Sequence, residues 1–297
     1  MRLAAIDIGS NAVRLLIKDL EFDAVQGLRE DRIAYYRVPL RLGTKVFESG
    51  RISTSKVVAL EKTIKAFKLL LEVQGVEEFR ACATSALRNA DNRGEVIKRV
   101  SESSGIDIDC ISGEEEAQLI FENFKILGGE IDGDLLCVDV GGGSTELSLL
   151  CGEQRVAWES FRIGTVRMLN NGVERSEWQR MAEFLNTHAK SRQLTVAGTG
   201  GNINRFHKLA RLKKDELLTL KKLEKWVGRI ENEPMQNRSK RFGLKNNRAD
   251  VIVPAGKIYM EVLRAAGLNE IWVPKVGLSD GIILQLASEQ GLQFKDL

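Results

Sequence analysis

The chain has 297 residues, with 44 Lys plus Arg against 41 Asp plus Glu, so its formal net charge is only +3. A content of 43% hydrophobic and 29% charged residues is typical of a globular protein, and four prolines exclude a Pro-rich linker or a long disordered tail. The length fits one large domain or two medium ones.

The N-terminal apolar run is interrupted by Asp7, so we expect no signal peptide. Nowhere do 18 uncharged apolar residues follow one another, as a membrane-spanning helix would require. We therefore expect a cytoplasmic protein without a membrane partner.

Cysteine and histidine usage limits the chemistry that is available. The cysteines, Cys82, Cys110, Cys137 and Cys151, lie in apolar, strand-like stretches without a CxxC pair, which is typical of buried, reduced thiols. The two histidines, His188 and His207, show no zinc-ligand spacing, and their scarcity disfavours a Ser-His-Asp hydrolase. Catalysis would then depend on carboxylates, backbone amides, Arg and Lys, or a bound metal.

Strand and helix signals alternate along the first half of the chain. Two short apolar runs, 3–8 and 13–17, flank Gly9-Ser10-Asn11 and predict a β-hairpin. The elements expected after it are an extended run at 33–40, a helix at 53–74, a strand at 79–83, a helix at 91–103, a strand at 106–111 and a helix at 114–127. This order is typical of a mixed α/β fold.

The pattern begins again after a turn near Gly128-Gly129. Strands at 135–140 and 146–150 predict a second hairpin, joined by Gly141-Gly-Gly-Ser-Thr145. An offset of 132 places Asp139 on Asp7 and aligns the two hairpins throughout, which indicates a duplicated domain.

The remaining expected elements are a strand at 154–160, a helix at 177–190, a strand at 194–196, a helix opened by Gly198-Thr-Gly-Gly-Asn202, helices at 214–230 and 249–265, a strand at 270–273 and a helix at 278–289. Residues 231–241 are the candidate for a flexible connection. We predict two domains, 1–125 and 126–297, with the option that helix 278–290 packs back on the first.

Three turns have the composition of phosphate-binding loops: 7–11, 139–145 and 198–202. Each follows an apolar strand, and glycine lets an anion approach successive backbone N–H groups. A single turn of this kind is more often an ordinary connection, but three of them, two related by the repeat, favour a phosphate site in a cleft between two similar domains. Asp7 and Asp139 would face that phosphate through a divalent cation, with local capping of backbone amides as the alternative.

The net charge is unevenly distributed. Residues 205–248 contain 14 Lys plus Arg and 5 Asp plus Glu, a net charge of +9, which leaves −6 for the remainder. Such a stretch is either a set of solvated helix faces or a surface for a polyanion. Its position directly after the third turn favours a positive track for a phosphate chain.

Six ordered motifs resemble those of the exopolyphosphatase and guanosine pentaphosphate phosphatase family, whose hairpin turn is shared with actin, Hsp70 and sugar kinases. The motifs are Asp7-Ile-Gly-Ser-Asn11 followed by Arg14, Ala83-Thr-Ser-Ala-Leu-Arg88, Ile111-Ser-Gly-Glu-Glu-Glu-Ala117, Asp139-Val-Gly-Gly-Gly-Ser-Thr-Glu146, Gly198-Thr-Gly-Gly-Asn202 and Arg248-Ala-Asp-Val-Ile252. The resemblance implies two ribonuclease-H-like domains of the actin-like ATPase type that flank a central cleft.

The resemblance also implies the roles of individual residues. Glu116 would be the base that deprotonates water, whereas Glu114 and Glu115 fit an acidic first turn of a helix. Glu146 would hold the water or a metal, and Arg88 would bind a phosphate oxygen. The phosphate donors would be Ser10, Asn11, Gly142, Gly143, Ser144, Thr145, Gly201 and Asn202; Mg²⁺ or another divalent cation would bind Asp7 and Asp139.

The implied activity is hydrolysis of the terminal phosphoryl group of linear polyphosphate, with guanosine pentaphosphate as the alternative substrate. More distant alternatives are an ATP-dependent kinase and a non-catalytic polyphosphate or nucleotide sensor. Ala12, Asn202 and Ser279 depart from the family pattern. Because the chain ends at Leu297, we expect short polyphosphate rather than processive action on long polymers; no nucleic-acid sequence is expected as a partner, and a homodimer is left open.

Overall fold

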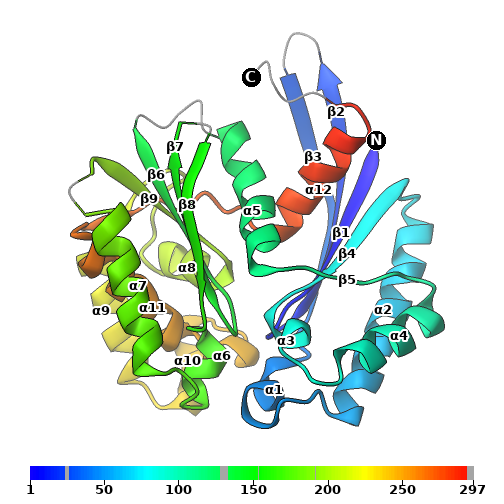
Figure 1. The fold of residues 1–297 in the computed structure, drawn as a ribbon, viewed down its shortest axis with the longest axis horizontal. Helices are drawn as coiled ribbons and strands as arrows, with labels where there is room; N and C mark the ends of the chain where they lie inside the picture. Colours follow the sequence, from blue (N-terminus) through cyan, green and yellow to red (C-terminus); the bar gives the residue numbers. More distant parts are fainter. Residues whose placement is uncertain (24–26, 128–132, 153, 191, 293–297) are drawn as a thin grey trace. The chain divides into compact units, whose positions relative to one another are not determined.

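The computed structural model describes residues 1–23, 27–127, 133–152, 154–190 and 192–292 (Figure 1). The chain divides into two compact units, the first formed by 1–129 with 277–297 and the second by 130–276. No helix among the described residues is long and apolar enough to cross a membrane. Each unit is built on a β-sheet that opens with one of the two hairpins expected from the sequence repeat.

The sheet of the first unit has the strand order β3-β2-β1-β4-β5. Its strands are β1 (Arg2–Ile8), β2 (Val13–Asp23), β3 (Gly27–Val38), β4 (Glu78–Ala83) and β5 (Asp109–Cys110). β1 is antiparallel to β2 and parallel to β4, so it lies in the middle of the sheet. Its residues from Leu3 to Ile8 are buried, as expected for a central strand that is covered on both faces.

Helices cover both faces of this sheet (Figure 1). The helices of this unit are α1 (Gly43–Ser49), α2 (Thr54–Val73), α3 (Ser85–Arg88), α4 (Arg93–Ser104), α5 (Gly113–Leu127) and α12 (Leu278–Glu289). α2 and α4 lie on one face, and α5 and α12 on the other (Figure 1). α2 and α4 pack against each other and bury Leu60, Ile64 and Val100 in a core shared with β1 and β2. α12 packs on β1, β2, β4 and α5, so the last helix of the chain covers part of the sheet with which the chain begins.

The sheet of the second unit repeats this plan in the order β8-β7-β6-β9. Its strands are β6 (Asp134–Val140), β7 (Thr145–Cys151), β8 (Gln154–Phe161) and β9 (Leu194–Thr199). β6 is antiparallel to β7 and parallel to β9, as β1 is to β2 and β4. The duplication inferred from the 132-residue offset is therefore present in the strand pairing.

The second unit contains helices beyond those that pack directly on its sheet. Its helices are α6 (Thr165–Leu169), α7 (Arg175–His188), α8 (Gly201–Leu209), α9 (Leu220–Glu231), α10 (Met235–Phe242) and α11 (Ile252–Ala266), with a short ladder of β10 (Leu218–Thr219) and β11 (Glu270–Ile271) and a 3-10 turn at Asn246–Arg248. α11 is the central helix: it contacts α7, α8, α9 and β6, and Tyr259 and Ile258 on it are fully buried. α8, α9 and α10 contain most of the basic stretch 205–248.

Three local predictions were wrong. Residues 231–241, expected as a flexible connection, largely form α10. The strand expected at 106–111 is reduced to Asp109–Cys110, because only these residues pair with β4. The helix expected at 214–230 begins at Leu220, after β10 has paired with β11 and Thr219 has capped the helix by accepting from the Lys222 N–H. The expected turn near Gly128-Gly129 lies outside the described residues.

Candidate active site

The first turn connects β1 to β2. The Gly9 N–H donates to the Ala12 carbonyl at 3.1 Å, which closes the turn. The Ser10 and Ser85 hydroxyls lie 2.7 Å apart, so the turn is bonded to the start of α3. Asp7, 5% exposed, is the cross-strand partner of Arg14, and the two side chains form an ion pair. Arg14 thus balances the charge of Asp7.

The second turn, 141–144, connects β6 to β7. The Gly141 N–H donates to the Ser144 carbonyl at 2.9 Å, whereas the N–H groups of Gly142 and Gly143 donate to no acceptor within the part of the chain that the structure describes. The Thr145 side chain is fully buried and its hydroxyl donates to the Ile163 carbonyl at 2.6 Å. Two backbone donors are therefore available to an anion, while the Thr145 hydroxyl stabilises the hairpin.

The third turn leads from β9 into α8. Gly200 has a φ of +95°, a conformation that favours glycine. The Thr199 hydroxyl donates to the Asp139 carboxylate, and the Tyr259 hydroxyl donates to the Thr199 carbonyl. Burial raises the pKa of the Tyr259 phenol well above its usual range, and the nearby Asp139 raises it further, so this donor stays protonated. These bonds connect the third turn to the strand that precedes the second.

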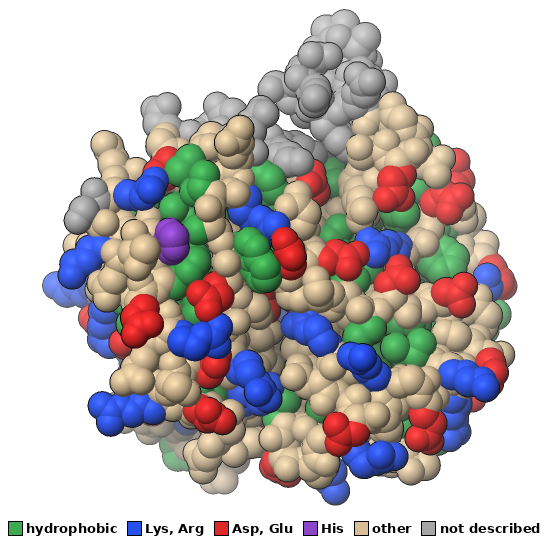
Figure 2. Space-filling model, viewed as in Figure 1, with side chains coloured by type: hydrophobic (Ala, Val, Ile, Leu, Met, Phe, Trp, Pro, Cys, Tyr) green, Lys and Arg blue, Asp and Glu red, His purple; other side chains and the backbone are tan. Residues whose placement is uncertain are grey.

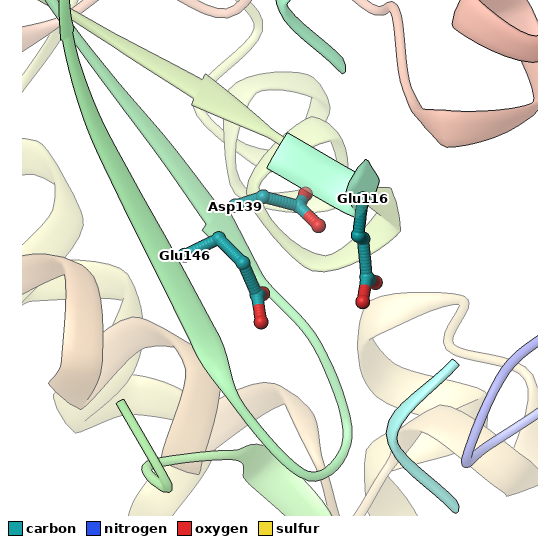
Figure 3. Close-up of side chains that lie close together, drawn as sticks. All are labelled: Glu116, Asp139 and Glu146. Carbon is teal, nitrogen blue, oxygen red and sulfur yellow. The ribbon is translucent and has the colours of Figure 1, made fainter. Parts of the chain in front are cut away.

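Two carboxylates lie side by side at the end of the second hairpin (Figure 3). Asp139 on β6 and Glu146 on β7 are directly opposed cross-strand partners, with oxygens within 4.8 Å of each other. Glu146 is 2% exposed and accepts from the Ser160 hydroxyl at 2.9 Å. Like charges in directly opposed positions destabilise a sheet. A divalent cation would remove that repulsion, and an all-oxygen donor set is the kind that Mg²⁺ prefers.

The first turn of α5 places its three glutamates in different surroundings. Glu114 is exposed, and Glu115 forms an ion pair with Arg80 at 2.7 Å. Glu116 is only 7% exposed, and its Oε2 lies 3.1 Å from Nη1 of Arg88, which also donates to the Ile111 carbonyl. Glu116 is the fourth residue of α5. Glu116 is therefore the buried glutamate of the three, paired with the arginine that the sequence had singled out.

Similar known proteins show the family to which the chain belongs. Residues 25–290 match the Ppx/GppA phosphatase family. The chain belongs to this family. Exopolyphosphatase 1 of Mycobacterium tuberculosis is 27% identical over 306 residues, which cover 96% of this chain and 88% of that relative. The Ppx/GppA family member of Aquifex aeolicus, known from a crystal structure, is 28% identical with a TM-score of 0.77 over 99% of both chains.

A third relative carries the other name of the family. The guanosine-5'-triphosphate,3'-diphosphate pyrophosphatase of Vibrio cholerae is 26% identical over 310 residues, which cover 99% of this chain and 60% of that relative. As a Ppx/GppA protein, the chain has the two-domain actin-like fold and is a hydrolase of phosphoanhydride bonds. The fold and enzyme class predicted from the sequence are thereby confirmed.

Two arginines support the second and third turns of this Ppx/GppA protein. Sequence reasoning missed Arg167 and gave Arg248 only as the start of a motif, without a role. The Arg167 Nε donates to the Gly143 carbonyl at 3.0 Å, and the residue is buried although it is charged; burial lowers the pKa of its guanidinium. The Arg248 Nη1 donates to the Gly201 carbonyl at 3.0 Å. An arginine within an apolar stretch, as in Gly164-Thr-Val-Arg-Met-Leu169, is a signal that could have indicated the first of them.

Close packing holds the second turn in place. A Cβ on Gly164 would lie 2.4 Å from the Gly143 carbonyl carbon and 2.5 Å from the Gly142 oxygen. The Val166 N–H also donates to the Gly142 carbonyl at 2.8 Å. In a trans peptide the N–H points away from the preceding carbonyl. The Gly141 and Gly142 carbonyls accept from the N–H groups of Thr165 and Val166, so the N–H groups of Gly142 and Gly143 point away from that segment.

Proposed function

We propose that this Ppx/GppA protein releases terminal orthophosphate from short linear inorganic polyphosphate. The observation that carries the proposal is the second phosphate turn, where two unengaged backbone N–H groups adjoin the carboxylates Asp139 and Glu146. Backbone donors of this kind stabilise the charge of a transferring phosphoryl group. The exopolyphosphatase relative, matched over most of its length, supports polyphosphate as the substrate.

In this mechanism Glu116 orients the attacking water and accepts its proton on a carboxylate oxygen. The reaction needs positioning more than a strong base, so a carboxylate suffices. Arg88 keeps Glu116 in one orientation before the reaction and offers a cation to the non-bridging phosphate oxygens. Gly142 and Gly143 bind the phosphoryl group that is transferred.

The metal would be held in the second unit by Asp139 and Glu146, whose adjacent negative charges suit a divalent cation such as Mg²⁺. When bound, it would supply positive charge to the phosphate oxygens. Asp7 stays a predicted ligand, but its ion pair with Arg14 makes it the weaker candidate of the two aspartates. Ser10, Asn11, Gly201 and Asn202 stay predicted phosphate donors.

Guanosine pentaphosphate is the second candidate substrate, because a relative named for that activity matches 99% of this chain. Phosphate release should be measured in parallel from tripolyphosphate, long-chain polyphosphate, guanosine pentaphosphate and ATP, with Mg²⁺ and again with excess EDTA. We expect the highest kcat/KM on tripolyphosphate and loss of turnover in EDTA. Release from guanosine pentaphosphate alone would support the second candidate, and release from none of the four would refute both.

A further inference from the structure

A cavity of about 650 Å³ lies in the second unit, among α8, α9 and α10 and the residues that follow α8. Five basic side chains line it: Arg205, Lys208, Arg211, Arg229 and Arg241. Glu233 is the single acidic residue in its lining. The basic stretch 205–248 thus directs an excess of positive charge into one cavity, which is the arrangement that concentrates anions.

Two of these cations have partners of their own. Arg241 forms an ion pair with Glu233, and Arg205 donates to the Phe242 and Gly243 carbonyls at the end of α10. Lys208, Arg211 and Arg229 have no carboxylate partner within the part of the chain that the structure describes. All three are exposed, so their mutual repulsion is screened by solvent, but an anion with several charges would be attracted by all three at once.

The backbone of Arg211 provides a second, independent observation. Arg211 follows the C-cap of α8 with a φ of +56°, and its N–H donates to the Lys208 carbonyl at 3.1 Å. A glycine is the usual residue where a helix ends in this left-handed conformation. An arginine there strains the backbone, and strain of this kind marks functional positions. Arg211 thus places a guanidinium at this cavity although a glycine would suit its backbone better.

An aromatic ring restrains one of these cations, Arg229. The Arg229 guanidinium lies over the Trp226 ring, 5.3 Å from its centroid, and Trp226 meets Phe242 edge-on at 6.3 Å. Stacking restricts a side chain that would otherwise be free in solvent, so less entropy is lost when it binds a ligand. The indole also serves as a reporter of binding at this site.

We propose that this cavity is a second anion site, which binds small molecules that carry several phosphates. No residue that lines it belongs to the turns at 7–11, 139–145 and 198–202: along α8, Arg205 stands four residues from Gly201 and Lys208 seven, roughly 6 and 10 Å at the helical rise. Two sources would satisfy its chemistry, inorganic polyphosphate and a guanosine polyphosphate. The proposal goes beyond hydrolysis, since it concerns binding alone and is tested without turnover.

The test is calorimetric and fluorescence titration of the whole chain in EDTA, with tripolyphosphate in one arm and guanosine tetraphosphate in the other. The cavity variant is Lys208→Ala with Arg229→Ala. The matched control is Lys221→Ala with Lys225→Ala, which removes the same charge from exposed positions of α9 outside the cavity. We expect the cavity variant to weaken binding by about tenfold or more and the control by less than about twofold.

The Arg211→Gly variant distinguishes a loss of anion binding from a loss of protein stability. Glycine suits a φ of +56°, so this variant should keep or raise the melting temperature while weakening binding by about threefold or more. Binding in either arm that depends on the cavity residues supports the site and identifies which of the two kinds of anion it binds. Absence of binding in both arms, equal losses in cavity and control variants, or unchanged affinity in Arg211→Gly would each overturn the proposal.

Discussion

At the residue scale, the two hairpins of the repeat differ at one cross-strand position. Arg14 opposes Asp7 in the first hairpin, and Glu146 opposes Asp139 at the same place in the second. An arginine neutralises its aspartate, whereas a second carboxylate doubles the local negative charge. A duplicated strand pair thus provides a balanced structural pair in one unit and a candidate cation site in the other.

This difference predicts that Glu146→Gln lowers divalent-cation affinity by about tenfold or more, because one of two ligand charges is lost. Without cation, the same change removes a repulsion and should stabilise the protein by up to about 1 kcal/mol. Equilibrium dialysis and thermal unfolding in EDTA measure the two effects. Glu183→Gln, at an exposed position on α7, should change neither. A destabilised Glu146→Gln protein in EDTA would contradict the argument.

A second prediction concerns the α5 glutamates. Glu116→Gln should bind polyphosphate normally but lose at least about a hundredfold in kcat, the usual contribution of a positioned base. Glu114→Gln, two residues away and exposed, is the control and should keep full activity. Single-turnover phosphate release with a separate binding titration tests both. Near-normal turnover in Glu116→Gln would show that another group accepts the proton.

At the scale of elements, one buried lysine connects the C-terminal helix of the chain to its N-terminal sheet. The Lys18 ammonium on β2 lies 2.8 Å from Asp280 in the first turn of α12 and 2.5 Å from Glu30 on β3. Burial by itself would lower the pKa of Lys18, but Asp280 and Glu30 raise it above the usual lysine value. Asp280 also accepts from the Gly277 N–H, so the same carboxylate caps α12.

We expect Lys18→Met to lower the free energy of unfolding by about 1–3 kcal/mol, because it leaves the half-buried carboxylate of Asp280 and the exposed one of Glu30 without their cation. A pKa that is raised in the folded state stabilises the protein fully at pH values below the pKa of the unfolded state. This stabilisation is lost as the pH rises through the pKa of the folded state. The deficit should therefore be constant from neutral pH to about pH 9 and shrink only above the usual lysine range, near 10.4.

Urea unfolding of Lys18→Met at several pH values measures this deficit. Lys65→Met is the control, because Lys65 pairs with Glu61 on an exposed face of α2 and should cost no more than about 0.5 kcal/mol. A deficit that disappears between pH 6 and pH 8 would mean that the ion pair is not its source.

At the scale of the whole molecule, each unit has its own hydrophobic core, and each core contains a buried thiol. Cys82 on β4 and Cys137 on β6 are buried, and burial raises the pKa of Cys82 to about 12 and that of Cys137 well above its usual range. Cys110 and Cys151 are half-buried. On the face shown in Figure 2, basic and acidic side chains are interspersed over the described residues, in keeping with the small net charge.

These thiols should report the unfolding of each unit. In native protein at pH 8, we expect iodoacetamide to modify Cys110 and Cys151 at least about tenfold faster than Cys82 and Cys137, since only the thiolate reacts. Mass spectrometry of tryptic peptides gives the rates. In urea the labelling of Cys82 follows the first unit and that of Cys137 the second. Fast labelling of either buried thiol in native protein would contradict its burial.

Local patterns were sufficient for much of this account. Strand alternation, glycine turns and the 132-residue repeat predicted both hairpins, because neighbouring residues determine these features. The flexible connection expected at 231–241 failed because its structure involves residues distant in sequence: α10 is a basic, polar helix without a buried residue, and its last residue, Phe242, meets Trp226 edge-on and accepts from Arg205. The short β5 likewise reflects a pairing with β4 that the sequence of 106–111 does not reveal.

The sequence by itself determined the duplicated α/β fold and the excess of positive charge in 205–248, and it predicted the three glycine turns and the carboxylates of the candidate site. Only the tertiary structure decided which partner each charge has. It placed Arg14 on Asp7, Arg88 on Glu116 and Glu146 beside Asp139, and it gathered the cations of α8 to α10 around one cavity. The reason is physical: residue type follows from the sequence, but electrostatic neighbours depend on strand register and helix packing between distant segments.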